Sequence, residues 1–308
     1  VDTMDTFVCS SWYYFRFTDP KNENAFASKE AIKQWLPVDM YMGGAEHTVL
    51  HLMYARFFTK ALHRLGMIDF NEPFSKLRHQ GMILAEDGRK MSKSLGNVVN
   101  PDSVIETYGA DTLRLHIMFM GPLEDMKPWS PGTILGSRRF IEKVWRLAER
   151  VDDRGEVNEN LLHKTIKKVG EDIETLNYNT AISALMILAS EMDKTERIQK
   201  DAYMNMLILI APFVPHVAEE LWHQIGEEGS VHEASWPQYD AFKIIDRHVT
   251  MAVQINGKVR DTIEVSADAS EEDVRKQAFA LEKVQGWIDG KDIRRVIFVK
   301  GRLINIVV

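Results

Sequence analysis

The period of the hydrophobic residues changes twice along this chain of 308 residues, and these changes constrain the fold more than any single motif does. Residues 1–130 mix short strand-like and helical stretches between glycines and prolines. Over 131–245 the apolar residues recur at helical spacing, and from 246 to 308 a strand period returns. The sequence therefore predicts a multidomain protein with a partial α/β region, an all-α helical bundle and a small α+β C-terminal domain, in that order.

Within the first region, strands are predicted to end at glycines. Phe7 to Phe17 is rich in aromatic residues and indicates a strand that runs into a turn or short helix. Val38 to Met42 indicates a second strand, which ends at Gly43-Gly44. Residues 46–65 then carry apolar side chains at helical spacing. This part of the chain predicts a strand, a glycine turn and a helix.

The other predicted elements follow from the same rules. Gly81 to Ala85 indicates a strand, and the polar loop 86–97 leads to Asn100-Pro101, which caps a helix that ends near Gly109. The remaining helices are expected near 110–120, 131–151, 158–176, 178–193, 198–210 and 214–225. In the tail we expect strands over 249–259, 262–265, 295–299 and 303–307 and a helix from Ser270 to about Trp287.

Composition narrows the class of protein. Hydrophobic residues make up 45% of the chain and charged residues 27%, which is typical of a folded domain rather than a disordered segment. The best apolar run, 204–217, is interrupted by two prolines and is shorter than the ~20 residues that a bilayer requires, so no membrane partner is expected. Cys9 is the only cysteine, which excludes an internal disulfide and favours a reducing, cytoplasmic location. The first residues resemble neither a start nor a signal segment, so we expect an internal beginning.

The sharpest chemical motif is Lys-Met-Ser-Lys-Ser at 90–94. Two lysines three residues apart, in a loop rich in glycine and serine, can place two ammonium charges on one polyphosphate, and serine hydroxyls and backbone amides can donate further hydrogen bonds. A solvated basic turn is the alternative for an isolated Lys-x-Ser-Lys. The full motif follows an apolar strand and precedes an Asn-Pro helix start, which favours phosphate binding.

With this motif the chain resembles the class I aminoacyl-tRNA synthetases, whose second signature is Lys-Met-Ser-Lys-Ser. Other segments narrow the resemblance to the bacterial leucyl-tRNA synthetase family. They begin at Asp5 (Asp-Thr-Phe-Val-Cys-Ser-Ser-Trp-Tyr-Tyr), Trp35 (Trp-Leu-Pro-Val-Asp), Gly43 (Gly-Gly-Ala-Glu-His), Arg138 (Arg-Arg-Phe-Ile-Glu-Lys-Val-Trp-Arg), Pro212 (Pro-Phe-Val-Pro-His-Val-Ala-Glu-Glu-Leu-Trp) and Val253 (Val-Gln-Ile-Asn-Gly-Lys-Val-Arg). The resemblance covers essentially the whole chain.

The resemblance implies a Rossmann-like catalytic half over 1–130 that uses ATP, with Mg²⁺ inferred from the reaction class. Lys90 and Lys93 are expected to stabilise charge while a leucine carboxylate attacks the α-phosphorus. Gly43 and Gly44 leave room for adenosine, and Glu46 can accept hydrogen bonds from ribose hydroxyls, although a glycine turn with a helix-capping Glu explains these residue types equally well. The expected ATP-binding set is Gly43, Gly44, Glu46, Met82, Ile83, Lys90, Met91, Ser92 and Lys93.

The resemblance also implies a leucine pocket. His47 and His51 lie one helical turn apart and border the pocket in the family, and Phe7, Ser10 and Tyr13 match its other wall. Phe7 and Tyr13 as plain core residues are the alternative. A metal chelate between the two histidines is the other alternative, but no third ligand is evident, so no metal site is predicted.

The resemblance implies that the bundle and the tail bind tRNA(Leu). Net charge is −7, which argues against a uniformly basic surface, so the RNA is expected to meet local basic patches. The expected contacts are Arg138 and Arg139 in the bundle and Lys258, Arg260, Arg294 and Arg295 in the tail. A solvated helix face is the alternative for Arg138 and Arg139. Trp145 and Trp222 are expected to be core residues, and the protein is expected to be a monomer.

The first class signature, of the His-Ile-Gly-His type, does not occur in these 308 residues, and no segment is long enough for an editing domain. Both are expected upstream of Val1, so this chain alone is predicted not to form leucyl-adenylate. The alternatives are an isoleucyl, valyl or methionyl enzyme, a non-catalytic tRNA-binding module and, more weakly, a metal hydrolase built on His47 and His51.

Overall fold

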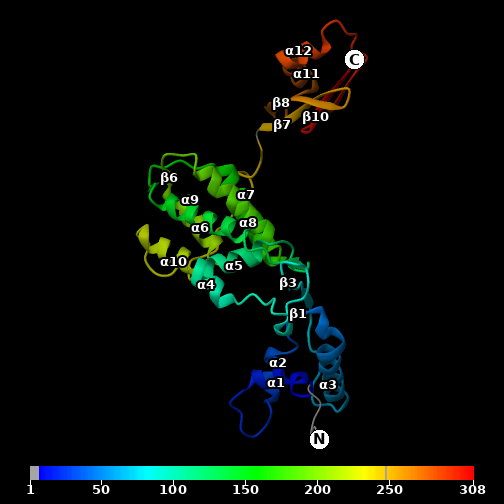
Figure 1. The fold of residues 1–308 in the computed structure, drawn as a ribbon, viewed down its shortest axis with the longest axis vertical. Helices are drawn as coiled ribbons and strands as arrows, with labels where there is room; N and C mark the ends of the chain where they lie inside the picture. The colour runs from blue at the N-terminus through cyan, green and yellow to red at the C-terminus, as the bar shows by residue number, and fades with distance from the viewer. Residues whose placement is uncertain (1–6, 247) are drawn as a thin grey trace. The chain divides into compact units, whose positions relative to one another are not determined.

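The structure, a computed structural model, describes residues 7–246 and 248–308. The part of the predicted motif at Asp5 and Thr6 lies outside these residues. The chain divides into two compact units: one runs to residue 157 and includes 168–237, and the other combines 158–167 with 238–308. Mixed α/β, helical and α+β segments follow one another as predicted (Figure 1). The predicted division into three domains, with boundaries at residues 130 and 245, stays a prediction.

The first segment opens on a helical turn, where we had predicted a strand that runs into a turn or short helix over Phe7–Phe17. A 3₁₀ turn η1 (Cys9–Ser11) leads into helix α1 (Tyr13–Thr18), and α2 (Lys29–Trp35) follows. The predicted short helix is present, but the described residues 7–17 contain no strand, because Tyr14 and Phe15 are both buried against Ala55 and Leu62. Neighbouring residues of a strand point to opposite faces, whereas a short helix at the edge of an aromatic core buries both.

Strand β1 (Tyr41–Gly44) begins three residues later than predicted and ends at the glycine pair. It pairs in parallel with β2 (Leu77–Gln80), so that Gly44 lies opposite Gln80. Between the strands the chain forms a 3₁₀ turn η2 (Ala45–His47), a π-helical turn η3 (Thr48–Leu52) and helix α3 (Met53–Arg64). The predicted strand, turn and helix are present, and β2, which was not predicted, completes a βαβ unit.

A second parallel pair carries the lysine loop. Strand β3 (Ile83–Leu84) pairs with β4 (Lys127–Pro128), and the loop between β3 and the next helix contains a 3₁₀ turn η4 (Lys93–Leu95). Helices α4 (Pro101–Tyr108) and α5 (Ala110–Phe119) follow. The predicted Asn100 cap is confirmed, because its side chain accepts a hydrogen bond from the backbone N–H of Asp102.

The predicted helical bundle is confirmed with small shifts at the ends. Its helices are α6 (Ile134–Ala148), α7 (Glu159–Glu174), α8 (Tyr178–Met192), α9 (Lys200–Ile210) and α10 (Pro215–Gln224), and the short strands β5 (Val151–Asp152) and β6 (Ile198–Gln199) pair beside them. Tyr203 is fully buried and donates a hydrogen bond to the Val144 carbonyl at 2.8 Å. Trp222 is buried as predicted, but Trp145 is 39% exposed, so the prediction that it belongs to the core was wrong.

A buried carboxylate joins the lysine-loop region to the bundle inside the first unit. Asp111, in the first turn of α5, accepts a hydrogen bond from Nδ1 of His216 at 2.7 Å and from the backbone N–H of Val217 at 2.8 Å. Both partners lie in the first turn of α10, where unpaired N–H groups favour a negative charge. Arg114 adds a hydrogen bond to the Pro212 carbonyl at 3.0 Å.

The C-terminal segment is a four-stranded sheet of order β8-β7-β10-β9, packed with helices α11 (Glu271–Ala280) and α12 (Glu282–Ile288). The strands are β7 (His248–Ile255), β8 (Lys258–Ser266), β9 (Arg295–Val299) and β10 (Leu303–Val307). The predicted strand 249–259 is divided by a turn at Asn256-Gly257, where both residues have positive φ, as a tight Asn-Gly hairpin requires. The predicted single helix is divided at Leu281, whose backbone is extended.

Among the described glycines, Gly81 is the one at which a side chain would overlap most closely with the rest of the fold. A Cβ there would lie 1.8 Å from the backbone oxygen of Asp125, because Gly81 also donates its N–H to the Leu123 carbonyl at 2.7 Å. We predict that Gly81→Ala lowers the free energy of unfolding by about 1–3 kcal/mol through this overlap. Urea denaturation measures it.

Gly136→Ala is the matched control, since a Cβ at this position in α6 meets no atom within 4 Å. It should raise stability by about 0.5–1 kcal/mol, because alanine loses less backbone entropy in a helix. Equal effects of the two substitutions would contradict the assigned role of Gly81.

Candidate functional site

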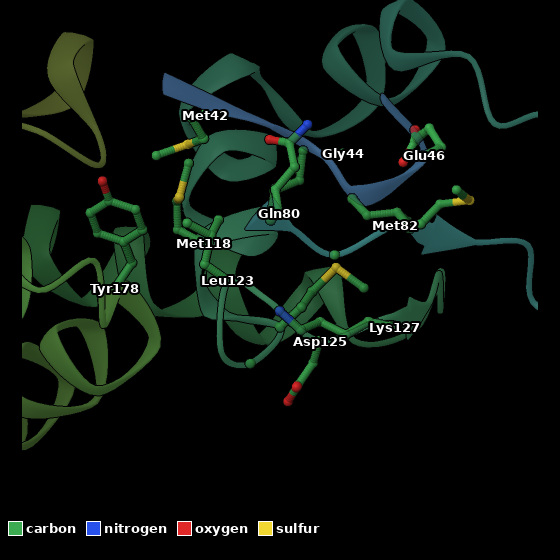
Figure 2. A pocket seen from close by; sticks show the side chains of 15 residues that line it. Met42, Gly44, Glu46, Gln80, Met82, Met118, Leu123, Asp125, Lys127 and Tyr178 are labelled. Atoms are coloured by element: carbon green, nitrogen blue, oxygen red, sulfur yellow. The ribbon is translucent and has the colours of Figure 1, made fainter. Parts of the chain in front are cut away.

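Two adjoining hollows surround the carboxyl end of β1. The larger has a volume of about 490 Å³, within the usual range of small-molecule sites, and Figure 2 shows its lining. Its walls come from both parallel strand pairs, the end of α5 and the first turn of α8. The lining residues are Met42, Gly44, Glu46, Gln80, Gly81, Met82, Ile83, Ile117, Met118, Met120, Gly121, Leu123, Asp125, Lys127 and Tyr178.

The smaller hollow, of about 240 Å³, shares four residues with the larger one, Met42, Gly44, Glu46 and Gln80. Its other lining residues are Tyr41, Gly43, His47, His51, Leu52, Leu77 and His79. The structure thus brings the glycine pair, the glutamate and both histidines of the predicted site together around one strand end. Met82 and Ile83, predicted from a separate segment, line the larger hollow beside them.

Gly44 determines where the Glu46 carboxylate lies. A Cβ on Gly44 would come within 2.2 Å of Oε2 of Glu46, so the carboxylate rests against bare backbone at the strand end. A Cβ on Gly43 would meet no atom within 4 Å, which leaves open space beside the backbone. Glu46 itself is exposed and lines both hollows, so its carboxylate can accept hydrogen bonds from ligand hydroxyls.

The two predicted histidines have different environments. His47 is exposed, whereas His51 lies in the π-helical turn and is only 6% exposed. Burial lowers the pKa of His51, and the neighbouring His47 lowers it further, so the ring is neutral near pH 7. Nε2 of His51 lies 2.7 Å from the hydroxyl of Tyr41, which in turn lies 3.1 Å from the hydroxyl of Tyr13. Tyr41 was missed by the sequence analysis.

Of the predicted aromatic wall, only Tyr13 is linked to the smaller hollow. Its ring lies 6.2 Å from the His51 ring, and its hydroxyl reaches the same histidine through Tyr41. Phe7 stacks on Tyr54 at 6.1 Å, and Ser10 donates to the Phe7 carbonyl at 3.0 Å. None of Phe7, Ser10 and Tyr13 is among the residues that line either hollow.

Neutral contacts anchor the lysine loop. The Ala85 N–H donates to the Arg89 carbonyl at 2.8 Å, and Asn97 clasps the motif by accepting from the Ser92 N–H at 2.8 Å and donating to the Lys90 carbonyl at 3.3 Å. Ile83 and Met91 pack on the cluster of buried residues Val104, Leu113, Trp129 and Ile134. Two residues predicted to contact ATP therefore also hold the loop in place.

Lys90 and Lys93 are exposed, and within 7–246 and 248–308 neither ammonium group has a carboxylate or other hydrogen-bond partner. Both charges are therefore available to an anion. Neither lysine lines the two hollows, but the loop leaves the larger hollow through Met82 and Ile83, eight residues or fewer before Lys90.

The larger hollow also contains one positive and one negative side chain that the sequence analysis did not predict. Lys127 and Asp125 both line it, and Figure 2 shows them at one wall. Burial lowers the pKa of Lys127, while the negative charge of Asp125 opposes that shift. The Lys127 ammonium donates to the Pro122 carbonyl. Nothing in the local sequence marks these residues, because it is the β3–β4 pairing that brings them to the site.

The predicted RNA contacts lie in two separate units. On α6, Arg138 pairs with Glu142 at 2.9 Å, Arg139 is exposed, and Arg138, Trp145 and Arg146 line a groove of about 480 Å³. In the C-terminal unit, the guanidinium of Arg260 lies 3.6 Å from the centroid of the Trp287 ring, whereas Lys258, Arg294 and Arg295 are exposed. Both groups of residues offer cations on an accessible surface.

No cluster of three or more His, Cys, Asp or Glu side chains placed to hold a metal ion occurs among 7–246 and 248–308. In the same residues, the structure contains no helix with the length and hydrophobicity needed to cross a bilayer.

Two family descriptions match the chain. The description "tRNA synthetases class I (I, L, M and V)" matches residues 1–128, and "Anticodon-binding domain of tRNA ligase" matches residues 159–275. The first match covers both hollows except for Tyr178, and it contains the lysine loop. The second contains most of the bundle.

Solved structures agree with these matches. A LeuRS of Agrobacterium radiobacter K84, in a ternary complex with tRNA and LeuAMS, is 34% identical with a TM-score of 0.78 over 99% of this chain and 42% of its own. Two structures of Mycobacterium tuberculosis methionyl-tRNA synthetase, with methionyl-adenylate, are each 19% identical, with TM-scores of 0.52 and 0.50. They cover 70% and 62% of this chain and 48% and 45% of theirs, and they show the fold alone.

The fold, the hollows and both family descriptions define a class I tRNA synthetase. Within that class, the 34% identity over nearly the whole chain shows that the chain belongs to the leucyl-tRNA synthetase family. The chain spans 42% of the length of the LeuRS it matches.

Asn97 offers a direct test of how the lysine loop is held. Asn97→Ala removes both hydrogen bonds of the clasp, each worth about 0.5–1.5 kcal/mol, so the loop should open more often. We predict that trypsin cleaves after Lys90 and Lys93 roughly tenfold faster in this variant. Timed digestion followed by mass spectrometry measures the rates.

Ser94→Ala is the control, because it removes only the exposed contact between the Ser92 and Ser94 hydroxyls at 2.8 Å. Its cleavage rate should stay close to that of the parent chain. A cleavage rate in Asn97→Ala no faster than in the control would contradict the clasp.

Proposed function

We propose that this chain is the part of a leucine–tRNA ligase that carries the lysine signature, part of the leucine pocket and the tRNA-binding bundle. The reaction activates leucine with ATP to leucyl-adenylate and transfers the leucyl group to tRNA(Leu). One observation carries the proposal: residues expected from separate segments to bind ATP and leucine line two adjoining hollows at one strand end. The 34% identity to a LeuRS supports leucine as the substrate.

The larger hollow fits the nucleoside of ATP. Glu46 can accept hydrogen bonds from ribose hydroxyls, while the apolar side chains of Met82 and Ile83 can pack on a flat base. The triphosphate would then extend toward the free ammonium groups of Lys90 and Lys93. These groups stabilise the negative charge that builds on the phosphate oxygens as the leucine carboxylate attacks, and they form no covalent bond.

Magnesium fits this scheme as an ion that enters with ATP. The described residues hold no cluster of metal ligands, so phosphate oxygens and water would supply its coordination, as Mg²⁺ commonly requires. It neutralises phosphate charge when bound. The residues of this chain orient the nucleotide around it.

The smaller hollow fits the amino acid, with His47 and His51 in its lining and Tyr13 joined to it through the Tyr41 hydroxyl. For tRNA(Leu), we propose phosphate contacts by Arg138 and Arg139 on α6 and by Lys258, Arg260, Arg294 and Arg295 in the C-terminal unit. Each set is exposed on its own unit except Arg260, which is half-buried against Trp287. We further propose that the protein acts as a monomer in the cytoplasm, where ATP and tRNA are available.

The lysine pair is tested by ATP binding to the purified 308-residue chain. Each charge-assisted contact contributes about 1.5–3 kcal/mol, so Lys93→Ala should weaken ATP binding by about tenfold or more, and Lys90→Ala should act in the same direction. Calorimetric titration with ATP and Mg²⁺ measures both dissociation constants.

Lys33→Ala, an exposed lysine of α2, is the matched control and should leave ATP affinity within about twofold. If all three variants bind ATP equally well, the lysine loop does not bind the phosphates and the assignment fails.

The chain alone should not catalyse leucine-dependent exchange between ATP and pyrophosphate. Phosphoryl transfer needs in-line geometry with groups on both sides of the polyphosphate, and the 308 residues contain no His-Ile-Gly-His element for the second side. Radioactive pyrophosphate incorporated into ATP measures the reaction. Exchange clearly above the blank would refute the proposal that this chain carries only part of the catalytic site.

A non-catalytic tRNA-binding module is the second candidate, favoured by the match to an anticodon-binding domain over residues 159–275. Salt-sensitive binding of tRNA(Leu) together with a complete lack of ATP binding would support it. An isoleucyl, valyl or methionyl specificity is the alternative within the class, because one matched description names all four amino acids. Competition among the four free amino acids for binding to the chain separates them.

A further inference from the structure

His51 is the one predicted pocket residue that is both deeply buried and incompletely hydrogen-bonded. Its Nε2 contacts the Tyr41 hydroxyl at 2.7 Å, whereas its Nδ1 has no hydrogen-bond partner in the described part of the chain. The ring lines the smaller hollow together with Tyr41. Which of the two nitrogens carries the proton therefore determines what this wall of the hollow offers to a ligand.

Tyr41 is held so that its hydroxyl cannot turn away from this row. Its ring stacks on Phe74 with centroids 4.0 Å apart and an interplanar angle of 12°. The hydroxyl lies between Nε2 of His51 at 2.7 Å and the hydroxyl of Tyr13 at 3.1 Å. Burial raises the pKa of Tyr41, so the group remains a neutral hydroxyl with one proton to donate.

The Tyr41 hydroxyl has no hydrogen-bond partner in the described residues other than His51 and Tyr13, so its one proton goes to one of these two, which leaves two arrangements of the row. If Tyr13 donates to Tyr41 and Tyr41 donates to Nε2, then His51 carries its proton on Nδ1, as a buried N–H without an acceptor. If His51 donates from Nε2 to Tyr41 and Tyr41 donates to Tyr13, then only a lone pair on Nδ1 is left unpaired. Buried N–H groups without a partner are rarer in proteins than acceptors without one, and free histidine in water favours the Nε2–H form.

We propose that Tyr41 is a positioning residue that holds His51 in the Nε2–H tautomer and thereby leaves the Tyr13 hydroxyl as a hydrogen-bond donor for the amino-acid substrate. In this arrangement the Tyr13 oxygen accepts from Tyr41, so its own proton points away from the row. Tyr13 is half-buried and does not itself line the smaller hollow, so we infer that the carboxylate of a bound amino acid meets its hydroxyl beside Tyr41, which does line the hollow. The donor role of Tyr13 rests on the proposed leucine site, whereas the tautomer of His51 does not.

The test is nitrogen-15 spectroscopy of the imidazole rings in the 308-residue chain without ligand, with His51→Asn used to assign the His51 signals. The parent chain should show His51 with a protonated Nε2 and an unprotonated Nδ1. Tyr41→Phe keeps the aromatic ring and removes both hydrogen bonds, so the His51 signals should shift toward a mixture of tautomers. Tyr13→Phe should leave Nε2 protonated, because Tyr41 still accepts from it.

Tyr54→Phe is the matched control, since Tyr54 stacks on Phe7 and has no place in the row. Its His51 signals should match those of the parent chain, and equal urea midpoints would show that all variants fold. A protonated Nδ1 in the parent chain, or identical His51 signals in Tyr41→Phe and the parent, would overturn the proposal.

A leucine titration of the same samples tests the donor step. Tyr13→Phe should weaken leucine binding by about tenfold, the usual effect of a lost hydrogen bond to a charged group, and Tyr41→Phe should weaken it less. Unchanged leucine affinity in Tyr13→Phe would overturn the donor role. If the parent chain binds no leucine, the proposed amino-acid site and the donor role both fail, while the spectra still decide the tautomer on their own.

Discussion

The parallel register of β1 against β2 is the constraint on which the candidate site depends. It sets Gly44 opposite Gln80, and both residues line both hollows. Since side chains alternate along a strand, a slip of one residue would move each of them to the opposite face. The next residue, Gly81, lies against the Asp125 backbone without room for a Cβ. The register of β1 against β2 thus fixes both hollows and the position of Gly81, from which the chain continues into β3 and the lysine loop.

The loop shows how free charges can be held in place. Its anchors leave Lys90 and Lys93 free: the Asn97 clasp, the Ala85 turn with its Asp87–Arg89 ion pair, and the packing of Met91 on a buried cluster. An anchor made from Lys90 or Lys93 would have tied up the charge that a phosphate needs and would have carried a desolvation cost of its own. Because the backbone is anchored instead, both ammonium groups stay hydrated. Their desolvation then costs little free energy until an anion binds.

The sequence predicts elements whose signals are local and misses those decided by tertiary packing. The five bundle helices follow from the helical period, and the Asn100 and Ser270 caps from their own side chains. The start of segment 7–17 was predicted as a strand because its aromatic content suits both states, and the buried Tyr14–Phe15 pair favours the helix. Likewise, motifs indicated Gly44, Glu46 and His51, but Tyr41, Gly81 and Lys127 act through contacts between strands that no local pattern records.

The two hollows share Glu46 and differ in their other polar groups. Asp125 and Lys127 add two charged groups to the larger one, where a ligand with many polar atoms can use them. On the side of the smaller hollow, burial keeps His51 and Tyr41 neutral, and their hydrogen bonds are made to each other and to Tyr13. A charged imidazole there would have to be desolvated whenever an aliphatic side chain entered, at a cost that a hydrogen-bonded neutral ring avoids. In the proposed site, holding these groups neutral would let an apolar amino acid bind beside a highly charged nucleotide.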